Sequence, residues 1–210
     1  MAAEPPMVAL FTRVPVAGRV KTRLASVVGD AAALEVQRSL LDRTIRVVIG
    51  SKLDAELWID GDLLGLPVHP FVVRHQRGGD LGERMLDVFT DVYARNRAAI
   101  LIGSDCPVID AAYLNSAAAA LADGADVVIG PVEDGGYVLI GMARPQPELL
   151  IGMKWSAPSV SAETLRRAAI AELRTVVLNE LWDIDDATGL RRWQTLQGAK
   201  PDPRPSRSSE

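Results

Sequence analysis

The chain has 210 residues and a formal net charge of −4, with 48% hydrophobic and 24% charged residues. These values are ordinary for one α/β domain, and the acidic balance argues against nucleic acid or a membrane surface as a partner. A single cysteine excludes an internal disulfide and a thiolate zinc cage. No apolar run approaches the ~20 residues that span a bilayer, and no signal-peptide pattern is present, so we expect a cytoplasmic protein.

Short apolar runs alternate with segments of helical spacing along the chain. This pattern predicts strands at 7–12, 55–59, 71–74, 98–103, 126–131, 137–142 and 175–178. It predicts helices at 30–49, 80–95, 110–123, 159–173 and 187–196, with Asp30 as the N-cap of the first.

The alternation implies right-handed crossovers and a mainly parallel sheet. The link between the strands at 126–131 and 137–142 has no room for a crossover helix, so one strand there is expected to run antiparallel. We therefore predict a three-layer α/β/α sandwich with a mainly parallel, mixed sheet. It is expected to be one domain, residues 7–197, with disordered tails at 1–6 and 198–210.

The segment Ser104-Asp105-Cys106-Pro107 follows a run that is typical of a buried strand. Open α/β sheets bind ligands at the carboxyl ends of their strands, and Pro107 forces a turn there. Asp105 is therefore a candidate ligand for a divalent metal on a phosphate. The alternative is a helix cap, for which Asp110 competes. Cys106 is expected to be a small buried residue, because no comparable segment holds a histidine to activate it.

The segment after the first strand carries four cations in eleven residues, Arg13, Arg19, Lys21 and Arg23. Guanidinium and ammonium groups suit a polyphosphate, and Gly18 permits a tight backbone path. The segment is neither a Walker A loop nor a dinucleotide fingerprint. The alternative is a solvated basic loop, but its place after the first strand favours phosphate binding.

Two glycine-rich segments are further candidates. In the first, Gly79 and its neighbours would let backbone approach a base or ribose, and Gln76 could read a base edge; the alternative is a turn with Asp80 as N-cap. In the second, Glu133 and Asp134 could orient an acceptor or take its proton, although a hairpin turn explains the same residues.

Acids recur before the last predicted helix, where Asp183 and Asp185 alternate with Ile184. In an extended chain both carboxylates face one side, which suits a metal shared with Asp105 if the segments are neighbours. The alternative is helix capping, and Asp186 can cap while the other two bind metal.

Taken in order, these segments resemble those of the transferases associated with radical-SAM and selenoprotein-type domains, often labelled arsenosugar-biosynthesis glycosyltransferases. That family has the nucleotide-diphospho-sugar transferase fold, which is glycosyltransferase A-like and Rossmann-like. More distantly, the chain is similar to phospholactate guanylyltransferases and molybdenum-cofactor guanylyltransferases. The matching residues are Arg13, Pro15, Gly18, Lys21-Thr22-Arg23-Leu24, Gly79 to Met85, Gly103 to Pro107, Glu133 to Tyr137, Trp155-Ser156, Asp183 and Asp185.

Two features of the chain depart from the family pattern. Arg13 stands where the family usually has lysine, and Asp186-Ala187-Thr188-Gly189-Leu190 replaces the usual Thr-Pro-x-Asp-Leu. Loss of the proline and gain of Gly189 are expected to weaken the start of the last helix by about 1 kcal/mol.

The resemblance implies metal-dependent transfer from an activated nucleotide to a small-molecule acceptor, with Mg²⁺ or Mn²⁺ as the cofactor. The donor is a nucleotide-sugar in glycosyl transfer, or a nucleoside triphosphate in nucleotidyl transfer with release of pyrophosphate. A non-catalytic nucleotide sensor is the alternative from another class. We assign metal binding to Asp105, Asp183 and Asp185, and catalysis to Lys21, Arg23, Asp105 and Asp134. We assign substrate binding to Arg13, Gly18, Thr22, Gln76, Gly79, Asp80, Glu133, Gly135, Gly136 and Trp155.

Overall fold

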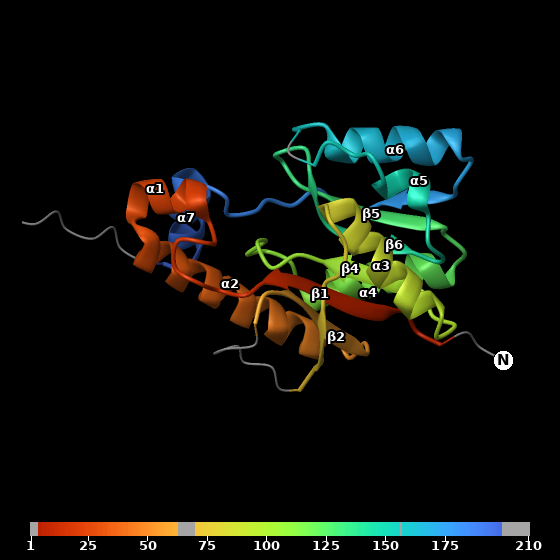
Figure 1. Ribbon diagram of the computed structural model, residues 1–210, viewed down its shortest axis with the longest axis horizontal. Coiled ribbons are helices and arrows are strands. Elements are labelled where there is room, and N and C mark those ends of the chain that lie inside the picture. Colours follow the sequence, from red (N-terminus) through yellow and green to blue (C-terminus); the bar gives the residue numbers. More distant parts are fainter. Residues whose placement is uncertain (1–3, 63–69, 156, 199–210) are drawn as a thin grey trace, which may run out of the picture.

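The computed structural model contains a seven-stranded sheet between two layers of helices (Figure 1). It describes residues 4–62, 70–155 and 157–198. The strand order is β3-β2-β1-β4-β6-β5-β7. The strands are β1 (Met7–Arg13), β2 (Ala55–Asp60), β3 (Val72–His75), β4 (Ala99–Ile102), β5 (Val127–Pro131), β6 (Tyr137–Met142) and β7 (Thr175–Val177).

Strand β6 runs antiparallel to both of its neighbours, β4 and β5, and every other pair in the sheet is parallel. The short link between β5 and β6 thus reverses the chain, as its length requires. This confirms the predicted mixed, mainly parallel sheet.

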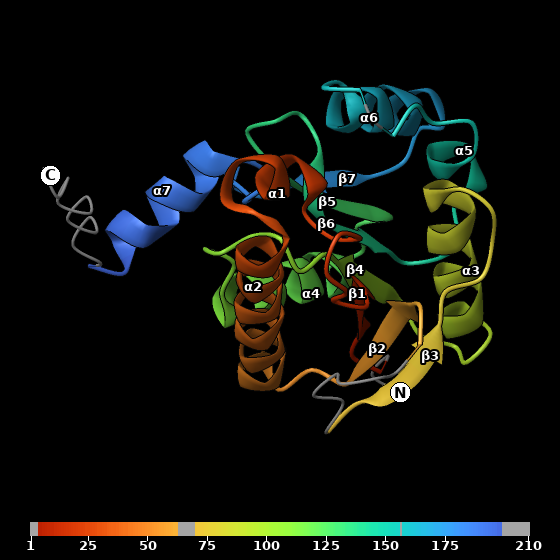
Figure 2. The same ribbon diagram turned by 60° about the vertical axis from the view of Figure 1, so that its left-hand side comes forward.

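The helices are α1 (Thr22–Val28), α2 (Asp30–Ser51), α3 (Leu81–Tyr93), α4 (Ala111–Ala122), α5 (Pro147–Leu150), α6 (Val160–Ile170) and α7 (Ala187–Leu196). Helices α2 and α4 cover one face of the sheet, and α3, α5 and α6 cover the other (Figures 1 and 2). This is the predicted three-layer sandwich. Helices α1 and α5 were not predicted, because seven and four residues are too few to show a helical period.

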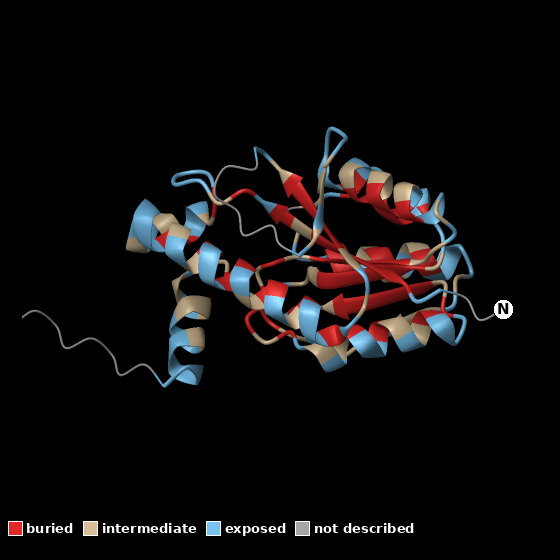
Figure 3. Ribbon diagram, turned by 90° about the horizontal axis from the view of Figure 1, so that it is seen from below, coloured by how far each residue is buried: buried red, intermediate tan, exposed pale blue. Residues whose placement is uncertain are grey.

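Alternation along β1 divides the core between the two faces. Val8 and Leu10 pack with Leu41 of α2, whereas Ala9 packs with Phe89 of α3. Successive side chains of a strand point to opposite faces, and β1 is covered on both, so Met7 to Phe11 are all apolar. Figure 3 shows the buried residues concentrated on the strands and on the inward sides of the helices.

A third cluster lies beyond the sheet, where α1, α7 and the first part of α2 meet (Figure 2). Leu24 of α1 and Leu40 of α2 pack there against Trp182 and Ile184, all at 7% exposure or less. None of the residues of α7 is buried. The cluster anchors the segment before α7, and with it the acids that flank Ile184.

The helix starts were only partly predicted. Asp80, Asp110 and Asp186 each accept a hydrogen bond from a backbone amide in the first turn of the helix that follows. The prediction for Asp30 was wrong: the N-cap of α2 is Gly29, with a φ of 85°, and Asp30 is the first helical residue. At that φ glycine is favoured, and Asp30 still complements the helix dipole.

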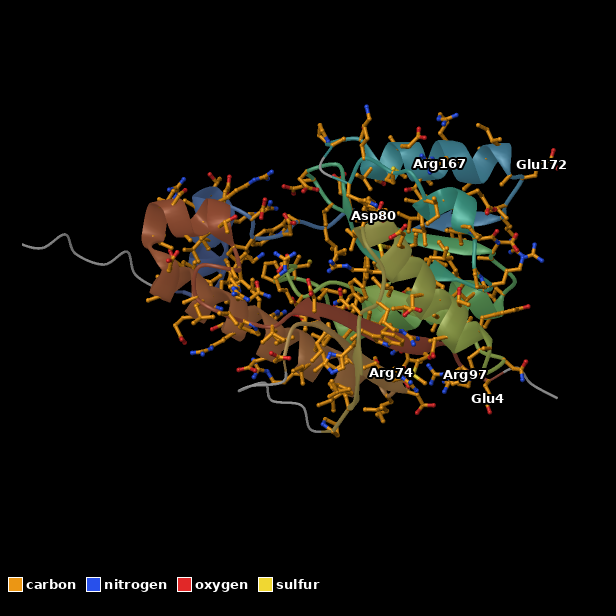
Figure 4. The ribbon with its side chains drawn as sticks, in the orientation of Figure 1. Glu4, Arg74, Asp80, Arg97, Arg167 and Glu172 are labelled. Carbon is orange, nitrogen blue, oxygen red and sulfur yellow. The ribbon has the colours of Figure 1, made fainter. Side chains whose placement is uncertain are left out.

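Most of the two predicted tails, 1–3 and 199–210, lies outside the described residues. At the N-terminal side, Arg97 donates hydrogen bonds to the carbonyl of Pro5 at 2.6 and 3.0 Å and lies 3.6 Å from Glu4 (Figure 4). Within the described part of the chain, no helix has the length and apolarity to cross a membrane. The single domain stays a prediction.

Candidate functional site

A cavity of about 840 Å³ opens at the carboxyl edge of the parallel strands. Its wall includes the ends of β1, β2 and β4, the start of the antiparallel β6, and segments before α6 and α7. Ligands of open α/β sheets bind at this edge. The structure brings these predicted site residues to the wall: Arg13, Lys21, Thr22, Arg23, Gln76, Asp105, Asp134, Gly136, Trp155, Asp183 and Asp185.

Lys21 is the most tightly held charged residue of this wall. Its Nζ lies 2.6 Å from the carbonyl oxygen of Ile184 and 2.8 Å from Oδ1 of Asp105, and its side chain is only 3% exposed. The backbone of Lys21 is left-handed, with a φ of 50°, just before α1. A buried ammonium needs such oxygen partners, so Lys21 joins the start of α1 to two segments at the cavity.

The segment that carries Asp183 and Asp185 runs directly beside the end of β4. The amide of Ile184 donates to the carbonyl of Asp105 at 3.0 Å. Because the Ile184 side chain is fully buried, its two acidic neighbours turn the other way, and both line the cavity. Arg23 reaches Asp185 at 2.7 Å.

Negative charge is concentrated around Asp183. Burial raises the pKa of its carboxyl to about 6, and the charge of Asp134 adds to this rise. Asp105 and Asp185 act in the same direction more weakly, while Lys21 opposes them. A carboxyl with a raised pKa among other acids would be stabilised in its charged form by a bound cation.

These carboxylates do not form a complete metal site. Among the described residues, no group of three histidine, cysteine or acidic side chains could hold a metal ion. The predicted trio Asp105, Asp183 and Asp185 is therefore not assembled as a metal site, and two of its members are paired with Lys21 and Arg23. Mg²⁺ commonly takes one or two carboxylates together with substrate phosphates. The donor set fits a hard divalent ion that brings phosphate oxygens with it.

The glycine-rich segment before α3 uses its polar groups internally. Asp80, at the start of α3 (Figure 4), accepts from the amide of Glu83 at 2.9 Å, and Glu83 accepts in return from the amides of Gly79 and Asp80 at 2.6 and 3.2 Å. This is a capping box. Neither Gly79 nor Asp80 lines the cavity, so for both the helix-start alternative describes this structure better than ligand binding.

Gln76 faces the cavity, but with fewer free groups than predicted. Its amide nitrogen donates to the carbonyls of Thr12 and Trp58, at 3.0 Å each. An amide nitrogen has two hydrogens, so both are used. Only the amide oxygen remains to contact a ligand, which allows it to accept a hydrogen bond and not to donate one.

The loop between β5 and β6 separates its two acids. Glu133 pairs with Arg192 of α7 at 2.8 Å and is not part of the cavity wall, whereas Asp134 is. A β-carbon at Gly135, whose φ is 89°, would collide with the carbonyl of Pro158. Gly135 therefore serves close packing of two loops, and Gly18 likewise lies outside the wall.

The apolar part of the wall includes Tyr137 and Trp155. Their rings meet edge to face, with centroids 6.3 Å apart and planes at 88°. Trp155 thus lines the cavity wall, although Ser156 beside it lies outside the described residues. Ring faces of this kind suit contact with a flat or ring-shaped group.

Sequence reasoning missed a polar cluster in the wall of the cavity. The Oγ of Ser104 accepts from the amide of Gln37 at 3.1 Å and lies 3.3 Å from the hydroxyl of Thr12. All three are at most 5% exposed. The available signal was that Gln37 lies four residues before Leu41, on the apolar stripe of its helix. A polar residue there needs a buried partner.

A second missed pair is Asp60 and Arg84. Arg84 donates to Asp60 at 2.7 Å, and Arg13 approaches the same oxygen at 3.6 Å. Both members line the cavity. Asp60 follows the apolar run of β2 as Asp105 follows that of β4, so an acid at a strand end was the signal.

Gly189 has a local function that its departure from the family pattern did not suggest. A β-carbon there would lie 2.9 Å from the carbonyl oxygen of Asp183 and 3.1 Å from the α-carbon of Ile184. Glycine thus lets the first turn of α7 pack directly on the acidic segment. Asp186 caps this turn through the amides of Thr188 and Gly189, at 2.8 and 2.9 Å.

The fold is that of nucleotide-diphospho-sugar transferases and nucleotidyltransferases, an α/β fold with a mostly parallel, mixed sheet of seven strands here. The chain belongs to the family DUF2064, described as "uncharacterized protein conserved in bacteria", whose model matches residues 33–157. The more specific radical-SAM-associated family stays a prediction from the motifs.

Solved structures extend the comparison. A protein of Desulfovibrio desulfuricans G20, described as "putative nucleotide-diphospho-sugar transferase", is 27% identical over 95% of this chain and 100% of its own, with a TM-score of 0.78. Rv0371c of Mycobacterium tuberculosis H37Rv is 15% identical over 92% and 98% of the two chains, with a TM-score of 0.59, and has also been crystallised with manganese.

A CMP:2-keto-3-deoxy-manno-octonic acid synthetase complexed with CTP is 13% identical over 93% and 99% of the two chains, with a TM-score of 0.51. At such identities the last two structures support the fold alone. No curated protein matches the chain.

Proposed function

We propose that this protein is a metal-dependent transferase that moves a glycosyl group from a nucleotide-diphospho-sugar to the hydroxyl of a small acceptor. The observation that carries the proposal is the cavity at the strand ends, where Lys21 and Arg23 face Asp105 and Asp185. Cations and carboxylates together suit a phosphate with its metal ion. The apolar wall at Tyr137 and Trp155 suits the face of a sugar ring.

In this proposal the residues of the wall divide the ligand between them. Lys21, Arg23 and Arg13 bind the diphosphate and offset its charge as it leaves. Asp105, with Asp183 or Asp185, would hold Mg²⁺ or Mn²⁺, which when bound supplies further charge neutralisation on the leaving phosphate. The likeness to the relative described as "putative nucleotide-diphospho-sugar transferase" supports this donor class.

The acid available to the acceptor is Asp134, because Glu133 is bound to Arg192 outside the cavity wall. The amide of Gly136 donates to Oδ1 of Asp134 at 2.8 Å, which fixes the carboxylate. The acceptor oxygen forms a bond to the anomeric carbon as the bond from that carbon to the diphosphate breaks. The hydroxyl proton passes to Asp134, and the diphosphate carries away the bonding electrons.

Nucleotidyl transfer is the second candidate, and the density of cations favours it. Arg13, Lys21, Arg23 and Arg84 all line the cavity, and a triphosphate carries more charge than a diphosphate. In this version a phosphorylated acceptor attacks the α-phosphate, and pyrophosphate leaves. A non-catalytic sensor is less well supported, since Asp134, the acid placed to take the proton of an acceptor, would have no task in it.

The first experiment compares thermal unfolding midpoints with nucleoside triphosphates, nucleotide-sugars and nucleoside diphosphates, each with and without Mg²⁺ or Mn²⁺. A ligand that binds only the folded state raises the midpoint. We expect a nucleotide-sugar to raise the midpoint in a metal-dependent way. An activity assay with an acceptor should then detect release of nucleoside diphosphate. A rise with triphosphates alone would favour nucleotidyl transfer. No rise with any ligand at millimolar concentration would contradict the whole proposal.

A further inference from the structure

Two carboxylates that the proposed function gives to a metal are bound instead to two cations that it gives to phosphate. Asp105 lies 2.8 Å from Lys21, and Asp185 lies 2.7 Å from Arg23. Both cations belong to the short stretch that starts α1, and both carboxylates belong to segments that Ile184 joins through its amide. The cations assigned to the phosphates and the carboxylates assigned to the metal ion therefore neutralise each other.

The two pairs differ in how firmly they are held. The side chain of Lys21 is 3% exposed and has a second partner in the carbonyl of Ile184, whereas that of Arg23 is 75% exposed. Exposed ion pairs are weak and exchange partners readily. A divalent ion placed on Asp185 or Asp105 would also meet the positive charge beside it, which opposes binding.

We propose, resting on the proposed function, that Lys21 and Arg23 pair with Asp105 and Asp185 in the free protein and so compete with a metal ion. Metal then binds well only together with the nucleotide. The phosphates of the nucleotide offer both cations charge-assisted hydrogen bonds. Once the cations turn to the phosphates, the carboxylates are free for the ion. Binding of metal and binding of nucleotide are then positively coupled, and the coupling is the same in both directions.

The pairing of Lys21 and Arg23 with carboxylates also explains why the described residues form no three-acid metal site, although several acids line the cavity. Asp183 forms no ion pair with any residue that the structure describes, yet alone it offers a metal one side chain. Two further ligands become available only when Lys21 and Arg23 are drawn away. The left-handed backbone at Lys21 places its side chain between the two acidic segments.

The decisive experiment measures Mn²⁺ binding without nucleotide, by the electron paramagnetic resonance signal of free Mn²⁺, on the full chain and on Arg23→Gln. We expect Arg23→Gln to bind Mn²⁺ alone about three- to fivefold more tightly, as loss of an exposed ion pair allows, and to bind nucleotide more weakly. The proposal requires this combination of a higher Mn²⁺ affinity and a lower nucleotide affinity. Loss of a residue that only shapes the site would lower both affinities. Arg23→Gln that binds Mn²⁺ no more tightly than the wild type would overturn the inference.

Arg38→Gln is the matched control, because Arg38 pairs with Glu35 at 2.8 Å on α2, outside the cavity wall. It should leave Mn²⁺ binding unchanged, and an equal gain in this variant would overturn the inference as a general charge effect. Lys21→Met should give a larger gain where far-UV circular dichroism shows it folded. If it does not fold, Arg23→Gln decides alone.

The Mn²⁺ measurement separates this inference from the proposed function. If nucleoside triphosphates or nucleotide-sugars bind the wild type and Arg23→Gln has no higher affinity for Mn²⁺, the competition between cations and metal is wrong. The transferase proposal then stands. If none of these nucleotides binds the wild type, the proposed function fails, and the exchange that depends on it is overturned whatever Mn²⁺ does.

Discussion

Two regions of this protein were both assigned to ligand binding from their charged residues and glycines, but they use these residues differently. The stretch at Lys21 and Arg23 directs its charges to acids that line the cavity. The glycine-rich segment at Gly79 and Asp80 closes its hydrogen bonds within its own capping box. Residue type alone therefore does not distinguish a ligand site from a helix start. The location of the partner does, across the cavity or within the same turn.

The largest expected effect concerns Asp105, one of the acids that line the cavity and pair with the Lys21 and Arg23 stretch. Asp105→Asn keeps the shape of the side chain but removes the charge that would hold a metal. We expect transferase activity to fall by about 100-fold and the metal-dependent rise of the melting midpoint to disappear. Asp110→Asn, a cap of α4 outside the cavity wall, is the control. Full metal dependence in Asp105→Asn would contradict the assignment.

The second effect is on stability at Lys21. Lys21→Met removes a nearly buried ammonium and leaves the carbonyl of Ile184 without this partner. We expect the free energy of unfolding to fall by about 2 kcal/mol, since Asp105 is half exposed and partly solvated. Urea denaturation measures it. Lys52→Met is the matched control, because Lys52 is also left-handed but exposed. Equal losses would show that the backbone conformation, and not the ammonium, matters.

The third effect is a pH dependence at Asp183. Its pKa of about 6 in the folded protein exceeds that of an unfolded aspartate, near 3.9. The folded state therefore holds the proton more tightly, and stability from this group falls as pH rises from about 4 to about 6. Asp183→Asn does not titrate and should be more stable than the wild type above pH 6.

We expect this gain to be on the order of 1 kcal/mol after allowance for partial solvation, and to vanish below about pH 4. Urea denaturation of both proteins at a series of pH values measures the difference between them. Asp42→Asn, an exposed position on α2, is the control. A gain for Asp183→Asn that is the same at pH 4 and pH 8 would mean that charge at this position is not the cause.

The smallest effect tests the helix-start side of the comparison. Asp80→Ala removes the cap of α3 and should lower the free energy of unfolding by about 0.5–1 kcal/mol. Nucleotide affinity should stay unchanged, because the Asp80 side chain accepts from the amide of Glu83 and does not line the cavity. Isothermal calorimetry with the nucleotide identified in the melting screen measures it. A tenfold loss of affinity would return Asp80 to the ligand site.

Local sequence patterns were enough to predict the layers and the edge of the sheet where the cavity lies. Hydrophobic periods located most strands and helices, and the short link between β5 and β6 predicted that one of these two strands runs antiparallel. An acid after the apolar run of β4 marked the cavity. These features are local, because a period of two or 3.6 residues and a strand end are visible within a few positions.

Which polar groups face the cavity, and which face each other, depends on contacts between distant parts of the folded chain. Lys21 and Ile184 are 163 positions apart in sequence, and Gln37 and Ser104 are 67 apart. Helix α1 is seven residues long and holds Leu24 in a cluster built from distant segments. Short helices depend on such packing more than on propensity. Hydrogen bonds and ion pairs between distant segments form only when the fold brings them together, so no local pattern could predict the pairing of Asp105 with Lys21.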